Sequence, residues 1–226
     1  MKNKSYYSEK LSAGKLKKCY HIAPLGIKKY LDAEIKHVLN KIKYSDTVLE
    51  LGCGYGRVLQ KTCEKAKEVI GIDISRPSIE LAKKLLKKNL NCQLFQMNAI
   101  NLKFPNYYFD MVICVQNGIS AFKVNKKELI KEAVRVTRRG GLVLFSSYSE
   151  KIWEERLKWF LLQSRAGLIG EIDINATGNG IIITKDGFRA TTIGPVEFSS
   201  LTSELNLDIN IEEVDNSSIF YEIIVS

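Results

Sequence analysis

The segment Val48-Leu49-Glu50-Leu51-Gly52-Cys53-Gly54-Tyr55-Gly56-Arg57 carries the strongest structural signal in this chain. Its start is β-prone, three glycines follow at alternate positions, and a helical pattern begins at Val58. A strand that enters a glycine-rich turn and then a helix brings bare backbone against a ligand, because glycine permits both the turn and the close approach. The next strand ends at Asp73, 21 residues after Gly52. A carboxylate at that position can accept both hydroxyl hydrogens of a ribose.

Around this segment, β-prone runs and helical patterns alternate with short connections. We expect strands at 47–51, 68–73, 92–97, 108–115 and 142–146, and helices at 25–43, 58–66, 77–88 and 126–137. In the helix 77–88, Pro77 suits the first turn and Ser75 the N-cap. This alternation predicts parallel βαβ units in an α/β fold with a doubly wound sheet.

The last third of the chain has a different pattern. We expect an apolar-rich helix at 152–168, a hairpin of two or three strands at 172–193 and a helix at 195–205. Two final strands, 208–214 and 219–225, are joined by a turn-rich segment and form an antiparallel pair. The sheet therefore gains two strands at its end, after an inserted β-hairpin.

Composition and charge narrow the class of protein. At 45% hydrophobic and 26% charged residues, the chain has the composition of a folded globular protein. No apolar run approaches the ~18 residues that span a bilayer, and no apolar stretch follows the first lysines. We therefore expect a cytoplasmic protein without a signal peptide or membrane insertion.

The five cysteines are widely spaced and form no C-x-x-C pair, and the two histidines, His21 and His37, are isolated. These spacings predict neither a disulfide framework nor a metal site. His37 is expected to be solvated on the polar side of its helix. The net charge is +9, and residues 1–43 hold 11 lysines against three acids. Dispersed lysines of this kind favour solvated helix faces, with attraction of RNA or another anionic partner as the alternative.

Two interpretations of the glycine loop compete. A dinucleotide site needs G-x-G-x-x-G, but Arg57 stands where the third glycine belongs. Glu50 also places negative charge where a pyrophosphate would pass. That acid suits a ligand with a positive end, such as an amino group or a sulfonium, so the dinucleotide interpretation is rejected.

The pattern Glu50-x-Gly52-x-Gly54-x-Gly56, followed by Gly71-Ile72-Asp73-Ile74-Ser75, resembles the class I S-adenosylmethionine-dependent methyltransferases. The resemblance covers roughly residues 44–147. It implies a Rossmann-like seven-stranded mixed sheet whose last strand is antiparallel, with S-adenosyl-L-methionine as cofactor and S-adenosyl-L-homocysteine as product. We expect one methyltransferase domain over 1–226, divided into a helical cap or lid (1–43), a cofactor-binding half (44–147), a substrate-side helix and hairpin insertion (148–207) and terminal antiparallel strands (208–226).

The same resemblance implies roles for individual residues. The glycine loop would hold the methionine part, with Glu50 reaching its amino group, while Asp73 would bind the ribose and Ile74 would lie on one adenine face. Asn98 stands where many relatives have Asp, and its amide oxygen and the Ala99 backbone would meet the adenine. The implied cofactor-binding set is Glu50, Gly52, Cys53, Gly54, Gly56, Asp73, Ile74, Asn98, Ala99 and Gln116.

Methyl transfer needs chiefly an aligned acceptor in a dry pocket, so a catalytic residue is not obligatory. His21 is the candidate base if the acceptor needs one. The substrate-side candidates are Tyr6, Tyr7, Tyr20, Asn117 and Trp153, and Trp159 and Phe160 are further aromatic residues of the same helix as Trp153. The alternative for each tryptophan is a place in the core.

The acceptor class is narrowed by what the sequence lacks. No Asp/Asn-Pro-Pro-Tyr run follows the fourth strand, no Pro-Cys pair offers a thiolate nucleophile, and no length remains for an appended RNA-binding module. A small-molecule acceptor is therefore favoured. An RNA or protein methyltransferase that uses the basic N-terminal region, and a non-catalytic S-adenosylmethionine-binding protein, stay open as alternatives. The sequence does not specify the oligomeric state.

Overall fold

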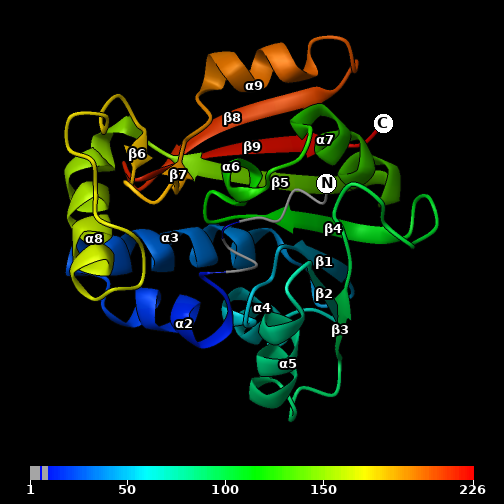
Figure 1. Cartoon of the computed structure of the whole chain (residues 1–226). Helices are drawn as coiled ribbons and strands as arrows, with labels where there is room; N and C mark the ends of the chain where they lie inside the picture. The colour runs from blue at the N-terminus through cyan, green and yellow to red at the C-terminus, as the bar shows by residue number, and fades with distance from the viewer. Residues whose placement is uncertain (1–5, 7–9) are drawn as a thin grey trace.

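The computed structural model describes Tyr6 and residues 10–226. Its centre is a seven-stranded sheet of order β3-β2-β1-β4-β5-β9-β8 (Figure 1). The strands are β1 (Thr47–Leu51), β2 (Glu68–Asp73), β3 (Cys92–Gln96), β4 (Phe109–Cys114), β5 (Thr137–Tyr148), β8 (Asp208–Val214) and β9 (Ser218–Ile224). Strands β1 to β5 pair in parallel, whereas β9 is antiparallel to both of its neighbours. The predicted mixed sheet with an antiparallel last strand is confirmed.

Helices cover both faces of this sheet. They are α2 (Ala13–His21), α3 (Leu25–Lys41), α4 (Arg57–Thr62), α5 (Arg76–Leu85), α6 (Gly118–Ala121), α7 (Lys126–Val136), the 3₁₀ helix η1 (Glu150–Ile152), α8 (Trp153–Arg165) and α9 (Pro195–Thr202). Figure 1 shows α7 and α9 on one side of the sheet and α3, α4 and α5 on the other. Ser75 caps α5, with its side chain accepting a hydrogen bond from the Ser78 N–H, and Pro77 lies in the first turn as predicted.

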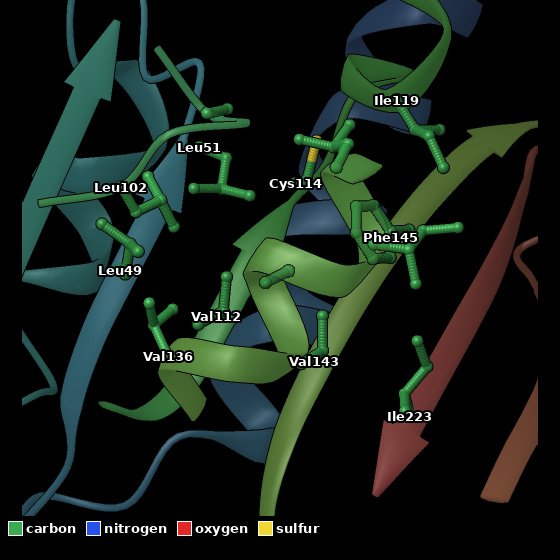
Figure 2. Close-up of a cluster of buried hydrophobic side chains, with 14 of the residues drawn as sticks. Leu49, Leu51, Leu102, Val112, Cys114, Ile119, Val136, Val143, Phe145 and Ile223 are labelled. Carbon is green, nitrogen blue, oxygen red and sulfur yellow. The ribbon is translucent and has the colours of Figure 1, made fainter. Parts of the chain in front are cut away.

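The two faces follow from alternation along the strands, because successive side chains of a strand point to opposite sides. On β4, Val112 and Cys114 belong to the core under α7, while Met111 and Ile113 belong to the core under α3, α4 and α5. Figure 2 shows the first of these cores, in which residues from β1, β4, β5 and β9 pack together. Both faces are buried, which fixes the register of the central strands.

A third apolar cluster joins the N-terminal helices to the insertion after β5. It contains Tyr30 of α3, Trp159 and Phe160 of α8, and Phe188 of the hairpin region. Segments far apart in the chain therefore form one cover at one end of the sheet, where α2, α3 and α8 lie close together in Figure 1.

The hairpin expected at 172–193 is present with two short strands, β6 (Ile182–Ile183) and β7 (Arg189–Ala190), and isolated bridges lie beside them. Two other details differ from the expectations. Strand β5 begins at Thr137, five residues earlier than expected, and the short α6 was not foreseen. Within the described residues, no helix is long and apolar enough to cross a membrane.

The expectation that His37 is solvated is wrong. Its ring centroid lies 4.2 Å from that of Phe220, and its Nε2 lies 2.9 Å from Oε1 of Glu222. Glu222 is a nearly buried acid on the β9 face that α3 covers, and Lys41 also pairs with it. His37 and Lys41 therefore lie over the sheet because β9 presents a carboxylate there that needs partners.

Candidate functional site

The glycine loop after β1 forms a tight cradle at the carboxyl end of the sheet. Gly52, Gly54 and Gly56 have φ values of +73°, +54° and +88°, a region that disfavours residues with a side chain. A Cβ atom at Gly52 would lie 2.7 Å from the Phe122 ring, so space as well as conformation requires glycine. The Cys53 N–H donates to the Ile72 carbonyl at 2.9 Å, which holds the loop against the end of β2.

Asp73 fastens the same loop from the end of β2. Its Oδ2 accepts from the Gly54 N–H at 2.9 Å and its Oδ1 from the Ser75 N–H at 2.7 Å. Burial raises the pKa of Asp73, and these two backbone bonds oppose the rise. Each carboxylate oxygen keeps a further acceptor site. Asp73 lines the cavity described below, so it can accept from a diol without giving up its backbone bonds.

The side chain of Glu50, the next-to-last residue of β1, is almost completely buried. It is 5% exposed, and its Oε2 has no hydrogen-bond partner among the described residues. Burial raises the pKa of Glu50 to about 8, although the nearby Arg57 guanidinium opposes this. An unpartnered buried carboxyl is costly in a folded protein. A cationic ligand with N–H donors would remove that cost.

Arg57, the first residue of α4, lines the same cavity as Glu50 and has N–H groups that are available as donors. Its Nε and Nη2 are buried and lack partners within the described part of the chain, and its guanidinium lies 4.9 Å from the Tyr20 ring centroid. Glu50 and Arg57 together offer one acceptor and one cationic donor set, which complement the ammonium and carboxylate of an α-amino acid. In the sequence, Arg57 indicated only that a dinucleotide site is absent.

These groups line a cavity of about 430 Å³. One side of it is formed by the residues after β2 and β3, where Ile74 is 50% exposed and Ala99 is buried. Asn98 also lines the cavity, but its Oδ1 already accepts from the Ile100 N–H at 3.2 Å. Asn98 Oδ1, which was expected to accept a hydrogen bond from adenine, is therefore partly occupied by a bond within the loop.

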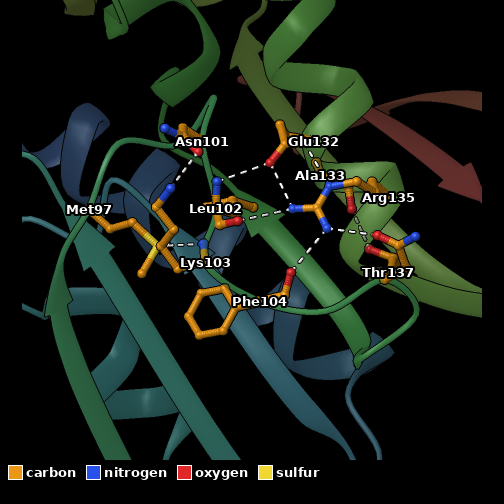
Figure 3. Close-up of polar contacts among 10 residues, drawn as sticks. Met97, Asn101, Leu102, Lys103, Phe104, Glu132, Ala133, Arg135 and Thr137 are labelled. Carbon is orange, nitrogen blue, oxygen red and sulfur yellow. Dashed lines mark hydrogen bonds and ion pairs between the residues drawn. The ribbon is translucent and has the colours of Figure 1, made fainter.

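Helix α7 holds the loop after β3 in place. Arg135 donates to the Phe104 and Leu102 carbonyls at 3.0 and 3.1 Å, and Glu132 accepts from the Leu102 N–H at 3.0 Å (Figure 3). The hydrogen bond from Arg135 helps to lower the pKa of Glu132, so this carboxylate stays ionised. The loop that carries Asn98 and Ala99 is thus anchored to α7 in addition to its own internal hydrogen bonds.

The turn after β4 lies on the opposite side of the cavity. Gln116 and Asn117 both have left-handed backbone conformations, with φ values of +57° and +60°. The Gln116 N–H donates to Oε2 of Glu34 at 2.8 Å, and its Oε1 accepts from the Tyr20 hydroxyl at 3.2 Å. Asn117 donates to the Thr191 carbonyl at 2.9 Å and accepts from Ser147 at 2.9 Å. Gln116 keeps a buried Nε2 that has no partner among the residues the structure describes, whereas Asn117 mainly connects elements.

Glu34 was missed by the sequence analysis. It is fully buried on α3, and burial raises its pKa to about 7 against the Gln116 backbone hydrogen bond. A signal was present, because Glu34 follows Leu31 by three residues and precedes Val38 by four, which is the spacing of the buried stripe. An acid at such a position needs a partner, and here the partner is the strained turn after β4.

Helix α2 covers the cavity from one side to the other. At its start the Ala13 N–H donates to Ser78 Oγ of α5 at 3.0 Å, and near its end the Cys19 carbonyl accepts from Trp159 Nε1 of α8 at 2.9 Å. Leu16, Cys19 and Tyr20 line the cavity beneath it. This helix belongs to the N-terminal region for which the role of a cap or lid was expected.

The remaining substrate-side candidates fall elsewhere. Tyr6 donates to Asp186 at 2.9 Å and packs against Phe188 in the hairpin region, and Tyr7 lies outside the described residues. His21 is exposed and does not line the cavity, which corrects its candidacy as a base. Trp153 faces a separate hollow beside Gly180, so its candidacy is corrected too. Trp159 and Phe160, one to two helical turns further on, line the main cavity instead.

Comparisons with known proteins agree with this geometry. Residues 48–141 match the family model described as a methyltransferase domain. The chain is 29% identical over 116 residues to the 2-methyl-6-phytyl-1,4-hydroquinone methyltransferase of Synechocystis sp., a match that covers 50% of this chain and 35% of that protein. It is 25% identical over 150 residues to a ubiquinone biosynthesis O-methyltransferase of Pelagibacter ubique, covering 62% and 59%. The matches thus span about one third to three fifths of these curated relatives.

Among solved structures, the PH0226 protein from Pyrococcus horikoshii superposes with a TM-score of 0.70 at 21% identity, covering 91% of this chain and 94% of that one. This likeness shows the shared Rossmann-like fold. Over residues 48–141 and in its fold, the chain is thus similar to the class I S-adenosylmethionine-dependent methyltransferases. The residues present fit the family's cofactor, S-adenosyl-L-methionine, because the unpartnered Glu50 carboxyl and the glycine cradle match its cationic amino-acid part.

Proposed function

We propose that this protein transfers a methyl group from S-adenosyl-L-methionine to a small-molecule acceptor. The observation that carries the proposal is the orphaned Oε2 of Glu50 beside the glycine cradle and Asp73, all lining one covered cavity. A nucleoside with a positively charged amino-acid tail satisfies each of these groups at once. When bound, the cofactor supplies an activated methyl group on a cationic sulfur.

The protein's own residues would then bind and orient. Glu50 accepts from the ammonium, Arg57 donates to the carboxylate, and Asp73 accepts from the ribose hydroxyls. Backbone of Gly52 and Gly54 allows close approach. Cys53 belongs to the same loop, and its own contribution is through its backbone bond to Ile72.

The other side of the cavity would receive the acceptor. The turn after β4 is held from three directions, by Glu34, by Tyr20 and, through Asn117, by β5 and the segment before α9. Helices α2 and α8 cover the space and exclude water, which strengthens interactions with the reacting groups. The main contribution of such an enzyme to catalysis is to hold the acceptor rigidly in position.

A small-molecule acceptor is supported by the shape of the site and by the relatives. The cavity is covered by α2 and its size is typical of small-ligand sites. A hydroquinone methyltransferase and a ubiquinone biosynthesis O-methyltransferase are among the relatives, and both names refer to small organic molecules. The basic residues of the first part of the chain favour RNA as the second candidate.

Formation of S-adenosyl-L-homocysteine in the presence of a panel of small aromatic and aliphatic acceptors tests the proposal. Turnover with a member of the panel, abolished in Asp73→Ala, supports it. Failure of the protein to bind S-adenosyl-L-methionine contradicts it. RNA is tested by filter retention at low salt: binding that falls steeply with added salt, with no turnover on small molecules, would replace the acceptor class.

A further inference from the structure

The end of the cavity away from Asp73 is built differently from the cradle. It is lined by Tyr20 of α2, Tyr148 at the end of β5, and Trp159, Phe160 and Gln163 of α8, here called the aromatic end. The hydrogen bonds at Ala13 and Cys19 show that α2 runs from α5, beside the ribose carboxylate, to α8. Six residues of helix separate these two contacts, about 9 Å along the axis. The aromatic end is therefore distinct in space from the ribose end.

The rings of the aromatic end stand around a common space. The Tyr20 ring lies 5.8 Å from the Trp159 ring, and Trp159 lies 5.9 Å from Phe160, centroid to centroid. Trp159, Phe160 and Tyr148 are each less than 10% exposed. Three separate elements thus contribute flat apolar surface to one hollow, an arrangement that suits a planar ring.

A polar group accompanies these rings. Gln163 is 3% exposed and lines the cavity, and no hydrogen bond holds its side-chain amide among the described residues. Gln116 adds a second buried N–H donor, its Nε2, which also has no partner. Buried amides are normally hydrogen-bonded, so two open amides on one cavity indicate that a ligand supplies the partner. Their N–H groups select an oxygen or nitrogen acceptor on that ligand.

Charge decides between a neutral and a cationic ring. Aromatic walls also attract cations, but the ring faces here already carry guanidinium groups. Arg57 lies 4.9 Å from the Tyr20 centroid, and Arg156 lies 4.5 Å from that of Tyr148 and 5.7 Å from that of Phe160. Of the charged residues lining the described cavity, Arg57 reaches the aromatic end at Tyr20, whereas Glu50, Asp73 and Lys123 are not part of that end. A cationic ligand would meet the Arg57 guanidinium at Tyr20, and the Tyr148 and Phe160 rings already pack against Arg156.

We infer that the aromatic end is a binding subsite for a flat, uncharged aromatic ring that carries a hydroxyl or carbonyl oxygen, with Gln163 as its specificity-determining donor. The inference rests on the proposed function, because it names the acceptor class of the same cavity. It assigns the rings the role of selecting planarity and the amides the role of selecting a polar substituent.

Three probes of similar size test this subsite. 2-Naphthol has the flat ring and the hydroxyl, decahydro-2-naphthol has the hydroxyl on a saturated frame, and 2-(aminomethyl)naphthalene is a cation at neutral pH. Binding is measured on protein saturated with S-adenosyl-L-homocysteine. Trp153 and Trp159 are the chain's two tryptophans, so an ¹⁵N-labelled sample shows two indole resonances. The Trp153→Phe variant assigns the one from Trp159.

The expected result is a saturable shift of the Trp159 indole resonance with 2-naphthol, while the Trp153 resonance stays in place. Decahydro-2-naphthol and the cation bind at least tenfold more weakly. Gln163→Leu weakens 2-naphthol five- to tenfold with its melting temperature kept, and Gln60→Leu, at an exposed glutamine of α4, does not change it. Equal binding of the three probes, or no effect of Gln163→Leu, overturns the inference.

The same sample separates this inference from the proposed function. Calorimetric binding of S-adenosyl-L-homocysteine without any response to 2-naphthol removes the aromatic subsite and leaves methyl transfer standing. Lack of S-adenosyl-L-homocysteine binding, with the Trp159 resonance still shifting on 2-naphthol, removes methyl transfer and leaves the subsite.

Discussion

Binding of S-adenosyl-L-methionine should release a proton, and Glu50 should be its source. Burial raises the pKa of Glu50 to about 8, so at pH 7 roughly nine in ten molecules carry the neutral acid before binding. The ligand's α-amino group is an ammonium at that pH, since such groups titrate near 7.7–8.0. Its arrival favours the carboxylate, which accepts from it.

The magnitude follows from the two protonation states. At pH 7, about 0.9 proton is released per ligand bound, and the affinity rises about ninefold from pH 6 to pH 7. Calorimetry in two buffers of different ionisation enthalpy counts the protons directly. Glu50→Gln should abolish both effects and weaken binding by about 1.5–3 kcal/mol, the range for hydrogen bonds to charged groups. Glu64→Gln, an exposed acid after α4, is the matched control.

Without ligand, the Glu50→Gln substitution should have the opposite effect and stabilise the protein. Because the pKa of Glu50 is raised in the folded protein, Glu50 does not lower the free energy of unfolding below about pH 4.5. Its destabilising effect grows as the pH rises toward 8. At pH 7, Glu50→Gln should therefore raise the free energy of unfolding, by up to about 3 kcal/mol, in urea titrations. The reasoning is refuted if the wild-type protein releases no proton on binding, or if Glu50→Gln releases as many.

Three further changes test other parts of the site. Asp73→Ala should weaken S-adenosyl-L-methionine at least tenfold by calorimetry, because paired hydrogen bonds to a carboxylate are lost, and an unchanged dissociation constant would refute the ribose assignment. Gly52→Ala should lower both the melting temperature and cofactor affinity, since φ is +73° and the new Cβ would meet Phe122 at 2.7 Å. Gly140→Ala, with φ +69° and nothing nearer than 3.7 Å, should leave the affinity unchanged and so isolates the contribution of the site. In ¹⁵N spectra, the backbone amide that Glu34 holds should titrate with a midpoint near pH 7, where burial places the pKa of Glu34, and Glu34→Gln should remove that titration.

Local sequence pattern specifies the glycine cradle and the sheet of this protein. The strands that end at Leu51 and Asp73 and the glycines between Gly52 and Gly56 are read from spacing alone, because hydrophobic runs and glycine turns act over a few residues. The final antiparallel strands were likewise visible, since their turn carries Asp215 and Asn216 in left-handed conformations that such residues tolerate.

The acceptor side depended on contacts between distant segments. Gln163 and Trp159 line the same cavity as Tyr20 only because α8 packs against the N-terminal helices, and no local pattern encodes that arrangement. Trp153 and Trp159 looked alike in sequence, yet six positions along a helix place them on different hollows. His37 was misjudged because its partner, Glu222, is 185 residues away.

The central claim is that the glycine cradle, Glu50 and Asp73 hold a positively charged nucleoside rather than a dinucleotide. Calorimetric titration of the wild-type protein at pH 7.5 with S-adenosyl-L-methionine, and separately with NAD and FAD, tests it most directly. We expect one micromolar site for S-adenosyl-L-methionine and no heat from NAD or FAD. Saturable binding of either dinucleotide, with none of S-adenosyl-L-methionine, would contradict it.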